Sequence, residues 1–148
     1  MKIILLIAMI PLLYPVKSQD KEKIEYQEIT IKCIQSTLEE QLILSDTDYQ
    51  KLLEKRSLHP DCDTYDLPEI DFDKHSLIGI HYGVAGCENP DVEINVYSLP
   101  DRTYQVKTEI TQIGLCKRLN HVKKWILIPR IDDPEKIGFD KTVTVNRE

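Results

Sequence analysis

Apolar and polar residues alternate over two neighbouring stretches in the second half of the chain. Residues 92–96 carry valine or isoleucine at every second position, and residues 104–110 repeat the alternation. A period of two is typical of strands that bury one face. The residues between them, Leu99-Pro100-Asp101-Arg102, are typical of a turn. We therefore predict a β-hairpin with a loop of medium length.

Further strands are predicted on both sides of this hairpin. Five segments have the alternation or the short apolar run of a strand: 29–33, 41–44, 77–84, 125–128 and 139–145. Residues 125–128 are apolar on both faces, which indicates a central strand. Pro129 follows and ends the strand, because proline cannot donate to a sheet.

One helix is predicted after residue 45. Ser45 is a good N-cap and Asp48 follows three positions later. Apolar residues then recur at helical spacing, at Tyr49, Leu52 and Leu53. We expect the helix to end at His59-Pro60, because the residue before a proline is pushed out of the helical region. The predicted fold class is mostly β (α+β): an antiparallel sandwich or open barrel of about seven strands with one packed helix.

The N-terminus has the pattern of a secretory signal peptide. Lys2 precedes an apolar run over residues 3–14, and Ser18 is a small residue before a polar chain. The run is shorter than the roughly 20 residues of a membrane-spanning helix. We predict that residues 1–18 are removed. The alternatives are cleavage one or two residues away and retention as an uncleaved anchor. Residues 19–148 then form a single domain without membrane contact.

The mature chain is acidic. Removal of residues 1–18 takes away two lysines, which leaves 17 basic against 25 acidic residues and a formal charge of −8. Nucleic acids and anionic membranes favour basic surfaces, so neither is expected as a partner.

Four cysteines support export to an oxidising compartment, periplasmic or extracellular. They are Cys33, Cys62, Cys87 and Cys116. An even number in an exported chain favours disulfides, whereas four buried free thiols would suit a cytosolic protein. Four cysteines allow three pairings. Because consecutive elements tend to be neighbours in space, we favour Cys33–Cys62 and Cys87–Cys116.

Charge is distributed unevenly along the chain. Residues 61–100 contain nine acids and one base, Lys74, whereas residues 117–130 contain five bases and no acid. We predict a partner-binding surface that includes four of these bases: Lys117, Arg118, Lys123 and Lys124. The alternative is that the oppositely charged segments neighbour each other in the fold, or merely solvate two of its faces.

No catalytic or metal-binding motif is present in the sequence. There is no G-x-S-x-G elbow and no phosphate-binding glycine loop, and disulfides would consume a cysteine nucleophile. The histidines lack the spacing of a zinc hydrolase, and the acid-rich residues 61–66 lack the glycine of a calcium loop. We therefore expect no enzyme activity, no metal and no cofactor, with an unrecognised hydrolase as the residual alternative.

Two segments carry a resemblance to a known family. They are Ile70-Asp-Phe-Asp-Lys-His-Ser-Leu-Ile-Gly79 and Val122-Lys-Lys-Trp-Ile-Leu-Ile-Pro129, separated by a small-residue turn and a hairpin. In this order the chain resembles the PrcB-type protease-complex subunits, in their C-terminal domain. The turn reads Ala85-Gly86-Cys87-Glu88 where the family pattern has a glycine pair. The resemblance implies a non-catalytic, β-rich module that binds and stabilises an exported protease.

Two functions thus remain open. The first is an exported interaction module that docks on another exported protein, such as a protease, through sheet-edge and loop residues. The second is a free-standing domain that binds a small ligand, or inhibits an enzyme, from a cleft between helix and sheet.

Overall fold

The computed structural model describes residues 21–35, 39–56, 62 and 66–147. The expected signal peptide, the predicted helix end at His59-Pro60 and most of the acid-rich segment 61–66 lie outside these residues.

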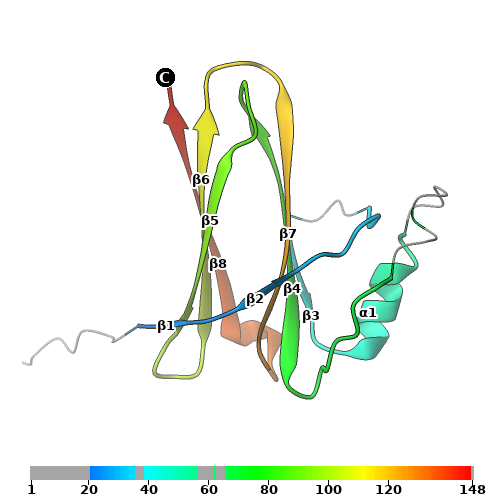
Figure 1. The fold of residues 1–148 in the computed structure, drawn as a ribbon. Helices are drawn as coiled ribbons and strands as arrows, with labels where there is room; N and C mark the ends of the chain where they lie inside the picture. Colours follow the sequence, from blue (N-terminus) through cyan, green and yellow to red (C-terminus); the bar gives the residue numbers. More distant parts are fainter. Residues whose placement is uncertain (1–20, 36–38, 57–61, 63–65, 148) are drawn as a thin grey trace, which may run out of the picture.

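Two four-stranded sheets pack face to face and form a mostly β sandwich with one helix (Figure 1). Sheet A has the order β1 (Glu22–Ile24), β5 (Asp91–Ser98), β6 (Tyr104–Ile113) and β8 (Ile137–Asn146). Sheet B has the order β2 (Gln27–Ile29), β7 (Leu119–Pro129), β4 (His75–Ala85) and β3 (Glu40–Ile43). The predicted fold class is confirmed, as a sandwich and not a closed barrel.

The predicted hairpin is formed by β5 and β6. Val96 lies opposite Val106 and Ile94 opposite Thr108, so the alternating residues of both strands share one face. This face meets Ile78 and other even-numbered residues of β4 and β7 in the core between the sheets. The predicted central strand is also confirmed, because β7 lies between β2 and β4.

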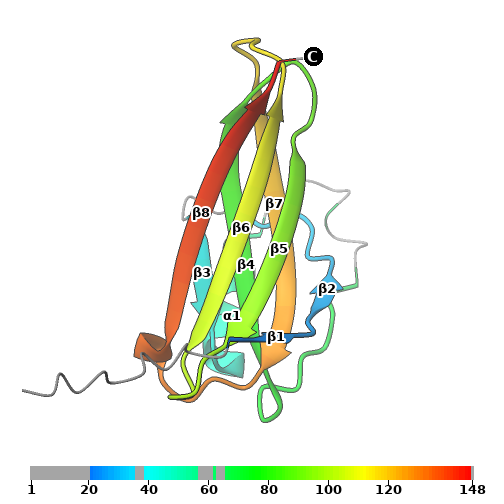
Figure 2. The same cartoon turned by 90° about the vertical axis from the view of Figure 1, so that its left-hand side faces the viewer.

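β8 departs from the antiparallel prediction, since it pairs parallel to β6 (Figure 2). Between these two strands the chain runs through β7 in sheet B and the 3₁₀ turn η1 (Pro134–Lys136). Two reversals of direction bring β8 back beside β6 with the same orientation.

The predicted strand 29–33 is wrong beyond Ile29. The chain leaves sheet B after β2, and Cys33 adopts a left-handed backbone with a φ of 69°. Residues 30–35, here called the crossing segment, run over the outer face of sheet B. Ile31 and Ile34 are buried against it, which explains their apolar character without a strand.

Helix α1 (Asp46–Leu53) begins at the predicted N-cap, where the Ser45 side chain accepts a hydrogen bond from the Asp48 N–H. Its end was predicted too late. Glu54 caps the helix and the chain then turns, because Arg56 forms a β-bridge with Ile34 of the crossing segment.

A second apolar core lies between α1 and the outer face of sheet B. Leu52 of α1 and Phe72 pack there against Leu77, Trp125 and Leu127 of the sheet. Together with the sandwich core this gives three layers, sheet A, sheet B and α1, which are visible from left to right in Figure 1.

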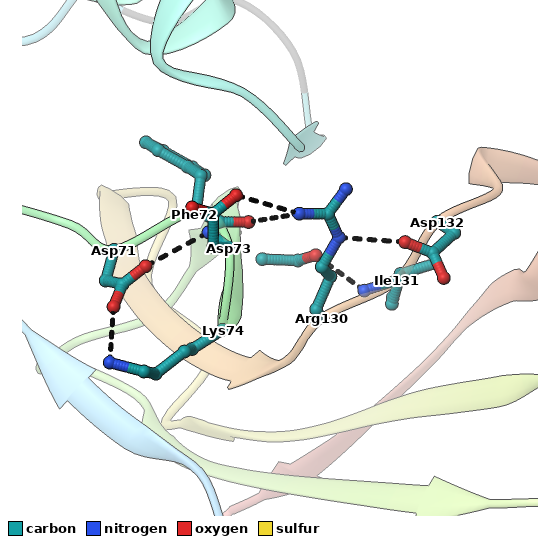
Figure 3. A network of polar contacts seen from close by, with 8 residues as sticks. Asp71, Phe72, Asp73, Lys74, Arg130, Ile131 and Asp132 are labelled. Carbon is teal, nitrogen blue, oxygen red and sulfur yellow. Dashed lines mark hydrogen bonds and ion pairs between the residues drawn. The ribbon is translucent and has the colours of Figure 1, made fainter.

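A polar network joins the turn before β4 to the end of β7 (Figure 3). The Arg130 guanidinium donates to the Asp132 carboxylate at 2.8 Å and to the Phe72 carbonyl at 3.2 Å. The buried Ile131 N–H donates to Ser76 Oγ at 2.9 Å. These bonds fix the relative position of the two long strands of sheet B.

Candidate partner-binding face

The described residues cover the outer face of sheet B over only half its length. Odd-numbered residues of β4 and β7 point to this face, because alternate strand residues point to opposite sides. Leu77, Trp125 and Leu127 lie under α1 and the crossing segment. Beyond them no described residue covers the side chains of this face. Six residues form this part, which we call the binding face: His81, Gly83, Ala85, Leu119, His121 and Lys123.

Apolar and imidazole side chains dominate the binding face. Leu119 is 59% exposed and lies over Gly83, where an added Cβ would stand 3.2 Å from Leu119 Cδ1. The rings of His81 and His121 lie beside each other on neighbouring strands, with centroids 5.6 Å apart. Gly83 and Ala85 of β4 are small, whereas Leu119 of β7 is large and exposed. This end of the face is therefore an open surface with exposed apolar area.

The binding face contains no carboxylate, although the chain as a whole is acidic. Lys123 is exposed on the face, between Trp125 and His121 on the same side of β7. Lys117 and Arg118 are exposed in the loop directly before β7, at the end of the face, near Leu115, which is 67% exposed. Basic and apolar groups thus lie together at this end of the molecule.

The four predicted basic residues do not form one surface. Lys124 follows Lys123 on a strand and so points to the opposite side of sheet B. Its ammonium lies 2.6 Å from the Glu28 carboxylate of β2. Only Lys123, Lys117 and Arg118 are therefore placed on or next to the binding face.

Sequence reasoning missed the other members of the face, above all His81, Leu119 and His121. These residues occupy odd-numbered positions of β4 after Gly79 and of β7 before Trp125, and so lie on the same side of the sheet as Trp125. The sequence identifies them as exposed only if the half of the sheet that the helix covers is already known.

The loops at the end of the face are tied together. Cys87 and Cys116 form a disulfide with a Cα–Cα distance of 4.7 Å, as predicted. The buried Asn120 side chain donates to the carbonyls of Gly86 and Glu88, at 3.2 and 2.8 Å. The loops before β5 and β7 are therefore held in one arrangement, which reduces the entropy lost when a partner binds.

A cleft of about 420 Å³ lies next to the binding face, on the side toward the crossing segment. The crossing segment forms its roof, and Gly79 and Trp125 line it from sheet B. The second predicted disulfide, Cys33–Cys62, anchors the crossing segment.

Ionisable groups at the β3 edge of sheet B link the two sheets. Tyr82 donates a hydrogen bond to Glu40, and burial together with this carboxylate raises the pKa of Tyr82 strongly. The Lys141 ammonium of β8 lies 4.2 Å from the Tyr82 ring centroid and 3.0 Å from Glu39. A β8 side chain in sheet A is thereby linked to sheet B.

Within the described ranges, no three His, Cys, Asp or Glu side chains are grouped so that they could hold a metal ion. In the same part of the chain, no helix has the length and apolarity needed to cross a membrane.

The chain matches no protein-family model, no curated protein and no solved structure. The resemblance to PrcB-type subunits is therefore still a prediction.

Proposed function

We propose that the protein is an exported, non-catalytic module that binds another exported protein through the binding face. The observation that carries this proposal is the half of sheet B that no described residue covers, where exposed Leu119 and Lys123 belong to a face whose six residues include no carboxylate. Exposed apolar groups next to charge are typical of docking sites. The disulfides fit an oxidising compartment, periplasmic or extracellular.

The partner surface is expected to be acidic. Lys123 lies on the face and Lys117 and Arg118 lie at its end, so a partner with carboxylates opposite them would be complementary in charge. Such complementarity mainly accelerates association and favours one orientation of the partner. The same bases disfavour a symmetric dimer in which two copies of the binding face meet, because like charges would then oppose each other.

An exported protease is the candidate that the family resemblance favours. The residues of that resemblance, 70–79 and 122–129, form the turn before β4 and parts of β4 and β7, the two central strands of sheet B. The place of these residues at the centre of the sheet supports a scaffold in common with the PrcB-type subunits. The binding face lies on that scaffold, and its exposed side chains would select the partner.

Co-purification from the native extracytoplasmic fraction tests this proposal. We would compare the wild type with Lys123→Glu, and use Lys23→Glu as a control with the same change of charge on the exposed β1 of sheet A. A specific exported partner should be recovered with the wild type and Lys23→Glu, and lost or strongly reduced with Lys123→Glu.

The association rate gives a second readout once the partner is identified. Reversing the charge at Lys123 should slow association by about tenfold at low salt and less at high salt, because exposed charges are screened. Thermal stability should be unchanged. Equal recovery and equal rates for both variants would contradict a role for the binding face.

A further inference from the structure

The connection between β6 and β7 forms an exposed tip of the sandwich, at the top of Figure 1. Every residue from 115 to 119 is exposed. Leu115 is 67% exposed and Leu119 is 59% exposed. Two basic residues, Lys117 and Arg118, therefore lie between two exposed leucines at this tip.

The backbone on both sides of Lys117 is fastened to two neighbouring residues in the connection between β4 and β5. On one side, Cys116 forms a disulfide with Cys87. On the other side, the Arg118 carbonyl accepts a hydrogen bond from the Gly86 N–H at 2.9 Å. Lys117 is thus an exposed residue between two fixed neighbours.

The residues that hold this tip are themselves held by the sandwich. The Asn120 side chain is buried, and it donates to the carbonyls of Gly86 and Glu88. The Cys87 N–H donates to the Ile113 carbonyl at the end of β6, at 2.7 Å. Because the tip is held in this way, it loses little conformational entropy when it enters a binding site.

We infer that this tip binds in the active-site cleft of a trypsin-like serine protease and inhibits the enzyme, with the Lys117 side chain in the primary specificity pocket. Such a pocket contains a carboxylate that selects basic side chains. Lys117 fits this role better than Arg118, because the Arg118 carbonyl is bonded to Gly86 and is not available to the oxyanion hole. The inference rests on the proposed function, since it names the class of the exported partner.

The two attachments beside Lys117 favour inhibition over rapid cleavage and release. If the enzyme hydrolysed the Lys117–Arg118 peptide bond, the disulfide would hold one new chain end and β7 would hold the other. Both ends would therefore stay in the cleft of the enzyme. A flexible loop with the same two bases would be cleaved and would dissociate.

Inhibition of purified trypsin by the protein with its disulfides intact tests the inference. We expect competitive inhibition by the wild type and by Lys117→Arg. Lys117→Ala should weaken inhibition by at least about 100-fold, because the charge in the specificity pocket is lost. Arg118→Ala is the matched control, since it removes the same charge from the next position, and it should weaken inhibition by less than about tenfold.

Lys117→Phe tests the position of the contact through a gain of activity that an unfolded variant would not show. This variant should inhibit chymotrypsin, whose specificity pocket is a hydrophobic slot, and should no longer inhibit trypsin. No inhibition of trypsin by the wild type would overturn the inference. Rapid cleavage after Lys117, detected from the mass of the protein, would also overturn it.

The proposed function has a separate outcome. If co-purification recovers an exported partner with the wild type and trypsin is not inhibited, the inference fails and the proposed function is retained. If co-purification recovers no partner, the proposed function fails.

Discussion

Gly79 and Trp125 lie opposite each other on β4 and β7, and the indole occupies the space where a side chain at position 79 would stand. A Cβ built on Gly79 would come 2.8 Å from Trp125 Cη2, which is closer than real contacts allow. The glycine therefore permits the indole to lie flat on sheet B. This pair supports both the second core and the floor of the cleft.

We expect Gly79→Ala to lower the free energy of unfolding by about 1–3 kcal/mol, because the rigid, buried indole must move. Gly83→Ala is the matched control. A Cβ there would meet the exposed Leu119 side chain at 3.2 Å, and this flexible group can rotate away. Urea denaturation measures both variants, and equal losses would contradict this account of Gly79.

Asp71 provides a pH-dependent contribution at the residue scale. Its carboxylate accepts a hydrogen bond from the Lys74 ammonium, at a distance of 2.7 Å, and this contact lowers the pKa of Asp71 (Figure 3). Since the carboxylate has a lower pKa folded than unfolded, its stabilisation is present above about pH 4 and is lost as the pH falls through the folded value.

Asp71→Asn should therefore reduce the loss of stability between about pH 4 and pH 2, while other carboxylates continue to titrate. Thermal unfolding of both proteins over this range measures the difference. Parallel curves for the wild type and the variant would show that Asp71 does not contribute.

The sequence shows which residues are charged, but it does not show on which side of the sheet each of them lies. The positive charge of Lys123 and Lys124 is visible, but the side of the sheet on which each lies depends on the phase of β7. That phase follows from the burial of Trp125 under α1, a contact between distant segments. Leu119 and His121 were missed for the same reason.

At the scale of elements, strands that flank a recognisable turn were predictable, and short or crossing segments were not. β5 and β6 alternate on both sides of the turn at 99–102, so local sequence suffices to define them. Ile29 and Ile31 have the same alternation, but the chain leaves the sheet after Ile29 and continues as the crossing segment. Its apolar residues pack on a second core that only the tertiary fold creates.

The two disulfides form a natural comparison, because both join residues that are 29 positions apart. The chain-entropy account then predicts a similar loss for each, about 3.6 kcal/mol. The expected functional effects differ. Cys33–Cys62 anchors the roof of the cleft, whereas Cys87–Cys116 joins the loops at the end of the binding face.

We expect Cys33→Ser/Cys62→Ser to preserve partner binding, because this bridge anchors the crossing segment and lies outside the binding face. Cys87→Ser/Cys116→Ser should weaken partner binding, because the loops at the end of the face are then no longer tied together. Urea denaturation and co-purification measure these outcomes under conditions where both variants are folded. An equal loss of partner binding in both variants would contradict separate roles for the two bridges.

At the scale of the whole molecule, the sandwich class could be predicted but the direction of β8 could not. Strand number and alternation indicate two layers, because each strand has one face to bury. The parallel pairing of β8 with β6 depends on which sheet β7 joins, and no local sequence feature predicts this. The half-covered outer face of sheet B likewise results from the short α1, which the sequence indicated would extend to His59-Pro60.

The central claim is that the binding face contacts another exported protein, and site-specific photo-crosslinking in the native compartment tests it most directly. A photoreactive residue at Leu119, which is 59% exposed, would report contacts of the face. The same residue at the exposed Thr142 of β8, on the outer side of sheet A, is the control. We predict a discrete adduct with an exported protein from position 119 and none from position 142. An adduct from position 142 alone, or none from either position, would contradict the account.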